Sequence, residues 1–307
     1  QMMGRLSLED FMQEVKEKLQ KRYKNLKVFT SENIKNNGTK VYAVTIVNRA
    51  SSVSPCTNVE GYYKKFESGE CDMEEIIMDI AEVYEKNVLN HDFAVHVFSN
   101  YDNAASHVRG RLINTEKNTE LLKEVPHREF LDLSLIYVVE LEYEEQKRVL
   151  SMRINNEHIK FWGVTEEDLY SQVKNNMDEM DESSFCSMEE VFKEMIGSGG
   201  EEVLEDLSGA YPPMYVLTNK RRLNGAVEIL DAKVLRRCAD VFGKDFIVIP
   251  SSIHECLLVP VSEEINDFDY IAKIVRDIND TQVPKDEILS YHVYKYDKQT
   301  ETMMIVA

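Results

Sequence analysis

The order of the elements predicted for residues 214–306 constrains the fold more than any other feature of the sequence. Short runs rich in apolar residues predict strands, and two apolar stripes at helical spacing predict helices. Residues 226–230 fit either a strand or the start of a helix. The strands fall at 214–218, 246–249, 254–259, 292–296 and 303–306, with helices at 234–242 and 268–278. Strand, helix, strand, strand, helix, strand is the order of a split β-α-β unit, so we expect a C-terminal module with an antiparallel sheet.

Residues 1–162 alternate between helix and strand patterns. Capping-box sequences at Ser7 and Asp72 predict two helices. Asn36-Asn37-Gly38 supplies the positive φ that a tight turn between two strands needs. Apolar runs predict these strands at 26–30 and 40–47, others at 93–98 and 131–141, and a hairpin of 149–154 with 158–162. These patterns indicate a mixed α/β region at the N-terminus.

Acidic residues are concentrated in the middle of the chain. The 307 residues include 36 Lys+Arg and 55 Asp+Glu, which gives a net charge of −19. Residues 163–209 alone hold 2 Lys+Arg and 14 Asp+Glu, which gives this segment a net charge of −12. Capping boxes at Thr165 and Ser187 predict helices in this segment. Because a sharp change in charge marks a boundary, we expect an α+β protein in three parts. They are the N-terminal region (1–162), an acidic helical connector (163–209) and the split β-α-β module (210–307).

Composition argues against several classes of protein. The acidic balance is atypical of nucleic-acid binders, which carry a basic face. No apolar run approaches the roughly 18 residues of a membrane span, and the first residues lack the apolar core of a signal peptide. The five cysteines are scattered without a C-x-x-C motif, which is typical of a reducing compartment. We therefore expect a soluble cytoplasmic protein with no membrane partner.

The densest group of reactive side chains lies at residues 250–256. Ser251, Ser252, His254, Glu255 and Cys256 are candidate catalytic residues in a turn between two predicted strands, where function is often found. If the second strand begins at His254, then Ser252, His254 and Cys256 share a face and Glu255 points away, which argues against a local Ser–His–Glu triad. The alternative is a structural turn in which the serines bond the backbone and His254 and Cys256 fill half-buried space.

Metal and cofactor motifs are missing from the sequence. A zinc site needs three or four convergent ligands, and His254 and Cys256 supply only two. His91 and His96 are five residues apart in a predicted strand, so they face opposite sides. No glycine-rich phosphate loop occurs, and Glu201 after the glycines of 197–200 would repel a phosphate. We therefore expect no metal and no cofactor.

A second candidate site is basic and would bind a ligand. Lys220, Arg221 and Arg222 stand between Asn219 and Asn224, and a basic cluster of this kind can hold a carboxylate or a phosphate. The alternative is a solvated hairpin tip, because short charge runs usually lie on the surface. All five residues remain candidate ligand-binding residues.

Several short strings along the chain match those of a known family. They are Gly61-Tyr62-Tyr63, Glu74-Glu75-Ile76-Ile77, Arg111-Leu112-Ile113-Asn114, Pro126-His127, Phe130-Leu131-Asp132-Leu133, Leu217-Thr218-Asn219, Asn224-Gly225-Ala226 and Pro250-Ser251-Ser252-Ile253-His254-Glu255. Together they resemble a bacterial family described only as domain of unknown function 5688, over nearly the whole chain. That family brings no catalytic assignment, so the resemblance implies one recurrent unit and leaves the function open.

Two functions are consistent with these features. The missing motifs favour a non-enzymatic binding or regulatory protein whose acidic connector contacts a basic protein partner. Neutralising Glu201, Glu202, Glu205 and Asp206 should then weaken a salt-sensitive association. The alternative is a hydrolase-like enzyme with His254 as general base and a nucleophile at Ser251, Ser252 or Cys256. In it, Asn219 or the basic cluster would bind an anion.

Overall fold

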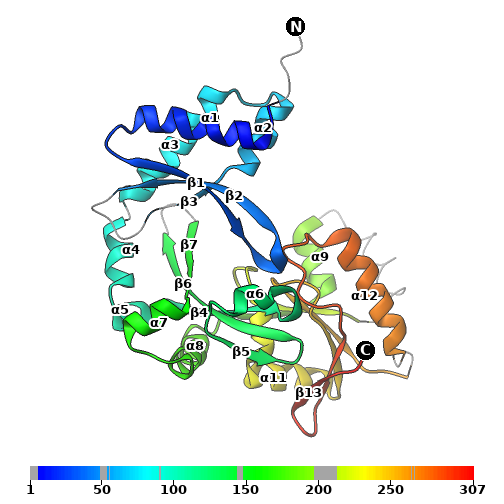
Figure 1. The fold of residues 1–307 in the computed structure, drawn as a ribbon. Coiled ribbons are helices and arrows are strands. Elements are labelled where there is room, and N and C mark those ends of the chain that lie inside the picture. Colours follow the sequence, from blue (N-terminus) through cyan, green and yellow to red (C-terminus); the bar gives the residue numbers. More distant parts are fainter. Residues whose placement is uncertain are drawn as a thin grey trace. The chain divides into compact units, whose positions relative to one another are not determined.

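The computed structural model of the chain describes residues 6–48, 54, 56–89, 91–143, 148–196, 213–263, 265 and 267–307. Helices and antiparallel sheets make up an α+β fold, as the sequence predicted (Figure 1). The chain divides into two compact units, Gln1–Ala104 and Ala105–Ala307. We expected a boundary near residue 162, where the charge changes. Residues 105–162 instead belong to the second unit, because Asn176 donates side-chain hydrogen bonds to the carbonyl oxygens of Ala105 and Val108.

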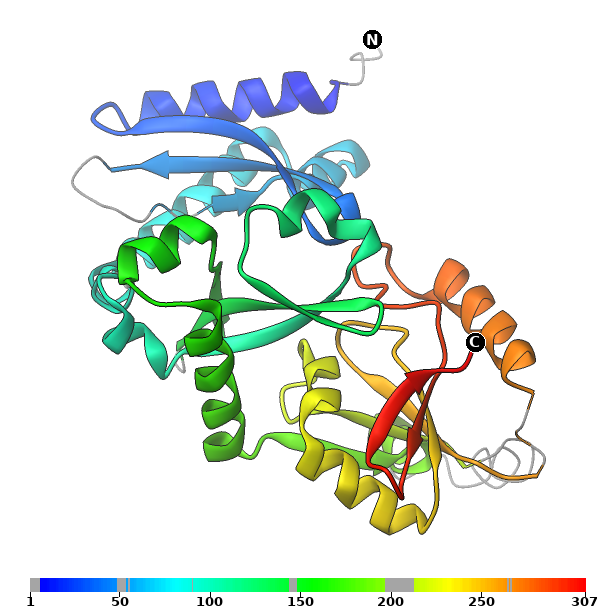
Figure 2. The same cartoon turned by 60° about the horizontal axis from the view of Figure 1, so that its bottom comes forward.

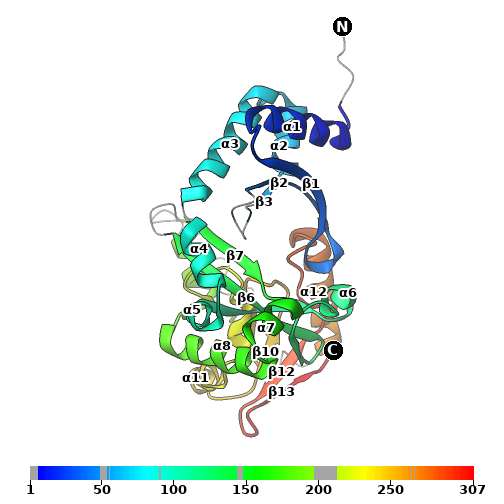
Figure 3. The ribbon, with the colours of Figure 1, turned by 60° about the vertical axis from the view of Figure 1, so that its left-hand side comes forward.

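The first unit is a three-stranded antiparallel sheet with helices along one side (Figures 1 and 3). The strands pair in the order β1-β2-β3, and the turn η1 (Asn36–Gly38) joins β1 to β2 with Asn37 at φ 58°. This confirms the predicted turn. The elements are α1 (Leu8–Arg22), β1 (Lys27–Ile34), β2 (Lys40–Val47), β3 (Cys56–Asn58), α2 (Glu60–Ser68), α3 (Met73–Leu89), α4 (His91–Phe98) and α5 (Tyr101–Ala105).

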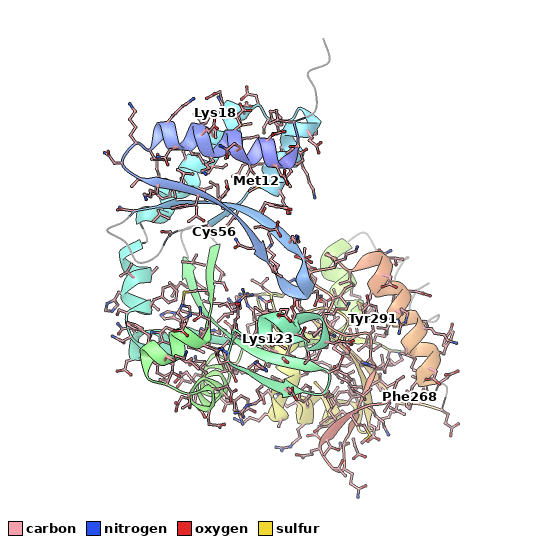
Figure 4. The ribbon with its side chains drawn as sticks, in the orientation of Figure 1. Met12, Lys18, Cys56, Lys123, Phe268 and Tyr291 are labelled. Atoms are coloured by element: carbon pink, nitrogen blue, oxygen red, sulfur yellow. The ribbon has the colours of Figure 1, made fainter. Side chains whose placement is uncertain are left out.

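The core of the first unit lies between this sheet and the apolar stripes of α1 and α3. Phe11, Val15 and Leu19 of α1 are fully buried with Ile76 and Ile80 of α3. Such side chains contribute roughly 1.5–3 kcal/mol each. In Figure 4, Met12 and Lys18 mark two sides of α1: Met12 is buried, and Lys18 pairs with Glu74 at 2.5 Å.

Two predicted strands are helices. Residues 93–98 belong to α4, where Ala94 and Val97 are buried three positions apart. A short apolar run fits both periods, and the helical one holds here. Residues 158–162 belong to α7 (Asn156–Trp162), because Asn155 caps the helix and His158 completes a capping box with its ring. Residues 158–162 are therefore not the hairpin partner of 149–154, and that prediction was wrong. The strand at 148–153 pairs instead with residues 138–143.

The second unit begins with a four-stranded antiparallel sheet built around one long strand. β6 (Leu133–Tyr143) pairs with β4 (Val108–Asn114) on one side, and with β5 (His127–Phe130) and β7 (Arg148–Arg153) on the other. The remaining elements here are η2 (Glu116–Asn118), α6 (Thr119–Leu122), α7 and α8 (Glu166–Met180). Gly110 of β4 lets α8 approach, since a Cβ there would lie 2.7 Å from Leu135 and 3.2 Å from Val173.

A six-stranded sheet forms the rest of the second unit, in the order β13-β12-β10-β11-β9-β8. β11 lies between β9 and β10 and is antiparallel to both, so β9-α11-β10 is a split β-α-β unit. This confirms the predicted module. The elements are β8 (Ser183–Ser187), α9 (Met188–Ile196), β9 (Tyr215–Asn219), η4 (Gly225–Leu230), α11 (Ala232–Phe242), β10 (Phe246–Ile249), β11 (Cys256–Pro260), α12 (Phe268–Gln282), β12 (Tyr294–Asp297) and β13 (Thr302–Ile305).

The two long helices of this module cover opposite faces of the sheet (Figure 2). Val275 of α12 packs with Ile247 and Val259, whereas Phe242 of α11 meets Phe246, whose side chain points the other way along β10. Helix α11 connects β9 to β10, and α12 connects β11 to β12. Both connections run in the same direction across the sheet, but they start from β9 and β11, which are antiparallel to each other. A constant right-handed crossover then places the two helices on opposite faces.

The acidic connector is not wholly helical. Its helices α8 and α9 begin at the predicted caps, Thr165 and Ser187. Between them, Ser183–Ser187 forms β8, an edge strand paired with β9. Phe185 fixes this strand by stacking on Tyr215, with ring centroids 5.2 Å apart. Part of the connector therefore belongs to the C-terminal sheet, while residues 197–209 lie outside the described residues.

Candidate functional site

The turn at residues 250–256 is held by backbone bonds to a distant segment. The carbonyl oxygens of Pro250 and Ser251 accept from the amides of Ser290 and Leu289, at 2.9 and 3.1 Å. Ser252 forms an isolated β-bridge with Ile288. These contacts tie the turn to the chain that precedes β12. Its geometry agrees with the structural alternative considered for this stretch.

Both ring nitrogens of His254 face structural partners. Its Nδ1 accepts from the backbone amide of Asn224 at 3.0 Å, and its Nε2 lies 3.5 Å from Glu287 Oε1. The expected strand face of Ser252, His254 and Cys256 is wrong, because β11 begins only at Cys256. Ser252 Oγ accepts the His254 amide at 3.1 Å and bends the chain there.

The nucleophile candidates make no described hydrogen bond to that ring, and Ser252 Oγ is engaged by the His254 backbone amide. Within the described part of the chain, no hydrogen bond joins the His254 ring to Ser251, Ser252 or Glu255. Cys256 is fully buried, and burial raises the pKa of its thiol far above the ordinary value, with Glu255 adding to the shift. A buried neutral thiol is inert toward substrates. The turn therefore lacks a base–nucleophile pair among its described residues.

The predicted basic cluster is a tight turn with its polar groups engaged. Asn219 accepts from the Leu223 amide at 3.1 Å and donates to the Leu223 carbonyl at 2.8 Å, and Lys220 Nζ donates to the Asp181 carbonyl at 3.0 Å. Arg222 and Asn224 have φ values of 52° and 54°. These residues shape the turn between β9 and η4. The solvated hairpin tip that was the alternative prediction therefore describes them only in part.

Arg221 is the centre of a buried ion-pair network. It donates to Glu140 at 2.9 Å and to Glu142 at 2.8 Å, and Arg111 donates to Glu140 at 2.7 Å. Only 3% of the Glu140 side chain is exposed, and it remains charged: burial raises its pKa, but the two guanidinium groups lower it further. Because Nη1 and Nη2 of Arg221 are already bound to Glu142 and Glu140 inside the protein, the ligand role predicted for Arg221 finds no support in this geometry.

A small cavity adjoins this network and was not predicted from the sequence. Its volume is about 40 Å³, and its polar walls include Arg109, Glu140, Glu182, Asn219 and Glu228. Burial raises the pKa of Glu228 to about 7, and Asp231 and Glu182 add to the shift. The sequence does contain a signal for this site, which is a single charged residue within an apolar run. Glu228 is the one charged residue of Gly225–Leu230, and Glu140 likewise has apolar residues on both sides.

Two larger apolar hollows lie between α8 and the η4–α11 segment. They measure about 230 and 190 Å³ and share Leu135, Tyr170, Leu230 and Ala232. Arg128, at the first of them, is fixed by Glu166 and lies 3.8 Å over the Tyr170 ring. Charged side chains also line them: Glu129 and Glu301 at the first hollow, and Lys174, Asp178, Asp231 and Lys233 at the second.

Comparison with known proteins identifies the family. Residues 8–298 match the family described as "Family of unknown function (DUF5688)". The chain belongs to this family. Neither a curated protein nor a solved structure matches the chain significantly.

Membrane-spanning helices and metal sites were sought among the described residues of this DUF5688 member. None of their helices has the length and apolar character to span a bilayer. Among the same residues, no group of three or more His, Cys, Asp or Glu side chains is placed to hold a metal ion.

Proposed function

We propose that this chain is a non-enzymatic binding or regulatory protein of a bacterial cytoplasm, and that its acidic connector contacts a basic protein partner. The observation that carries the proposal is the occupation of both His254 ring nitrogens by structural partners. The strongest group of reactive residues then serves the fold. A binding role remains as the function that the geometry supports best.

Exposed carboxylates on the connector favour a basic partner. On α8 these include Glu167, Asp168 and Glu179, and on α9 Glu189 and Glu190. Lys174 and Lys193 are the only basic residues in the sequence of this segment. A surface of one sign attracts an oppositely charged partner over about 10 Å at moderate salt.

Binding of a basic peptide tests this proposal. The probe is the amidated peptide (Lys-Gly)4, titrated by calorimetry at about 0.05 and 0.3 M NaCl. The connector variant is Glu201→Gln, Glu202→Gln, Glu205→Gln and Asp206→Asn, four residues outside the described ranges. The control variant removes the same charge from exposed positions elsewhere: Glu9→Gln, Glu116→Gln, Glu263→Gln and Asp277→Asn. The connector variant should bind about tenfold more weakly, and the control should lose much less. Equal losses in both would contradict the proposal.

A second candidate, the hydrolase-like enzyme, keeps one supporting observation. A carboxylate, Glu287, lies beside His254 Nε2, and 24% of the His254 side chain is exposed. Orientation of a catalytic imidazole by a carboxylate is a known arrangement. A fluorophosphonate probe that labels Ser251 or Ser252, and loses this labelling in His254→Ala, would favour the enzyme. Absence of labelling at both serines favours the binding protein.

A further inference from the structure

The small cavity beside the ion-pair network is lined by two arginines whose Nε donors lack an acceptor. Arg109 of β4 and Arg221 of the turn after β9 both contribute to its wall. The Nε atom of each is buried and has no hydrogen-bond partner among the residues that the structure describes. A buried donor without an acceptor is costly, so native structures contain few of them. The two N–H groups therefore call for an acceptor that the described residues do not supply.

Arg109 also lacks a paired counter-charge. Its Nη1 donates to the carbonyl oxygens of Ser106 and Val108, at 2.8 and 3.0 Å, and no carboxylate of the described residues forms an ion pair with it. Burial lowers the pKa of its guanidinium group; Glu140 opposes this shift, and the positive charge of Arg221 adds to it. The two arginines therefore repel each other beside one cavity. A negative ion there would reduce this repulsion and accept the missing hydrogen bonds.

The carboxylates around the cavity do not balance its arginines. Glu140 is bound by Arg221 and by Arg111, whose own Nε is a third buried donor without a described partner. Glu182 Oε2 lies 3.7 Å from Arg221 Nε, which is beyond hydrogen-bond distance. The three arginines thus face only these two carboxylates. Glu142, the remaining partner of Arg221, is half-exposed, so water screens its charge.

The third carboxyl group of the wall, Glu228, is mostly neutral at mildly acidic pH. It is 7% exposed, and burial raises its pKa to about 7. Asp231 and Glu182 add to the shift, and Arg237 opposes it. A neutral carboxyl group carries an O–H donor and no charge. Below pH 7 the cavity wall therefore offers N–H and O–H donors to an acceptor.

The size of the cavity limits the acceptor to a compact ion. A volume of about 40 Å³ is close to the roughly 30 Å³ that one water molecule occupies in the liquid. A chloride ion is only slightly larger than a water molecule, and it accepts hydrogen bonds from any direction. Sites for drug-sized molecules measure roughly 300 Å³ or more, so the cavity is too small for a larger organic anion.

We propose that this cavity binds a chloride ion, which accepts hydrogen bonds from the Nε–H groups of Arg109 and Arg221. This role differs from the one predicted for Arg221, in which the basic cluster clamps a carboxylate or a phosphate. The ion connects β4 to the turn after β9 and so adds to the link between the two sheets of the second unit. An ion that binds only the folded state stabilises it. The site goes beyond the proposed function and does not depend on it.

Chlorine NMR on the full chain tests the site directly. The probe is sodium chloride at pH 6, with sodium gluconate added to hold the ionic strength constant. The net charge of −19 keeps nonspecific binding of chloride low. Wild type should broaden the chloride resonance in a way that saturates with chloride and is reversed by bromide. Arg109→Met should weaken this binding about tenfold or more, whereas Arg276→Met, the same change at an exposed arginine of α12, should alter it less than about twofold.

Each result supports or overturns the site. Broadening by wild type that does not saturate overturns it, and so does equal binding by wild type and Arg109→Met; a water molecule is then the acceptor. If Arg109→Met fails to fold, Arg109→Lys takes its place, because it keeps the charge and removes the Nε–H donor, and it too should weaken binding. Thermal melts add a second readout: wild type should melt at a higher temperature in chloride than in gluconate, and Arg109→Met should lose this difference. The binding of (Lys-Gly)4 reports separately on the proposed function.

Discussion

Arg221, in the turn after β9, donates to Glu140 of β6 at 2.9 Å although the two residues are 81 positions apart. This contact joins the four-stranded sheet to the six-stranded sheet of the second unit. Arg111 binds the other oxygen of the same carboxylate. The pair therefore acts as a bridge, and its disruption should lower the stability of the second unit.

Arg221→Met should reduce the free energy of unfolding by about 3 kcal/mol, because it leaves the buried Glu140 with one partner in place of two. Urea denaturation measures the change. Lys220→Met, at the exposed neighbour, should cost less than about 1 kcal/mol. The triple change Arg111→Met, Arg221→Met and Glu140→Leu should recover part of the loss, since it removes the buried carboxylate together with both of its guanidinium partners. Equal effects of Arg221→Met and Lys220→Met would show that the bridge contributes little.

Gly225→Ala should destabilise the protein by about 3 kcal/mol or more. A Cβ there would lie 2.3 Å from Thr218 Oγ1, 2.5 Å from the Asn219 amide nitrogen and 2.8 Å from the His254 carbonyl oxygen. The matched change is Gly61→Ala on α2, where nothing lies within 4 Å. That variant should gain about 0.5–1 kcal/mol from helix propensity. A thermal melt that ranks the two variants in the opposite order contradicts the described packing at η4.

Glu228 should make stability fall as pH rises toward neutrality. Its folded pKa of about 7 lies above the ordinary value of 4.5, so the folded state keeps a proton that the unfolded state has lost. The contribution is complete below pH 4.5 and is lost as pH rises through 7, with an upper size of about 3 kcal/mol. The measurement is the difference in unfolding free energy between wild type and Glu228→Gln from pH 5 to pH 8. His107 and His158, whose pKa values are lowered by burial, act in the opposite direction and cancel in this difference. A difference that stays constant with pH refutes the assignment.

Cysteine labelling separates the structural turn from a nucleophile. Cys56 is exposed, whereas Cys238 and Cys256 are buried, and burial raises the pKa of Cys238 to about 12 and that of Cys256 further. In native protein, iodoacetamide should modify Cys56 first and leave Cys256 unmodified until the chain unfolds. Peptide mass spectrometry reads each site. Rapid native labelling of Cys256 would revive the enzyme hypothesis.

Local signals predicted most of the fold. The caps at Ser7, Asp72, Thr165 and Ser187 bind the amides three residues on, as their spacing indicated. The errors arose where local patterns were ambiguous. The apolar run of α4 is too short to separate the two periods, and the capping box at Asn155 uses His158 in place of the usual Glu or Gln. Strand β8 owes its place to pairing with β9, which no local pattern encodes.

The candidate site was less predictable than the fold. The sequence identified chemically reactive residues at 250–256 but not their partners, because the Asn224 amide and Glu287 reach His254 only through the tertiary fold. Glu140 and Glu228 carried a readable signal, a single carboxylate inside an apolar run. Such a residue must be paired or neutral once buried. Glu140 is paired and charged because Arg111 and Arg221 bind it. Glu228 has no such ion-pair partner among the described residues, and burial favours its neutral form.

The salt dependence of (Lys-Gly)4 binding tests the central claim most directly. Affinity should be measured by calorimetry across a salt series for wild type, the connector variant and the control variant with Glu9→Gln, Glu116→Gln, Glu263→Gln and Asp277→Asn. We predict that affinity falls with salt for wild type, and that the connector variant binds more weakly with a shallower dependence. The control variant should bind with nearly the wild-type affinity and salt dependence, because its four charges lie outside the connector. Equal affinities and equal salt dependence for all three proteins would contradict the account.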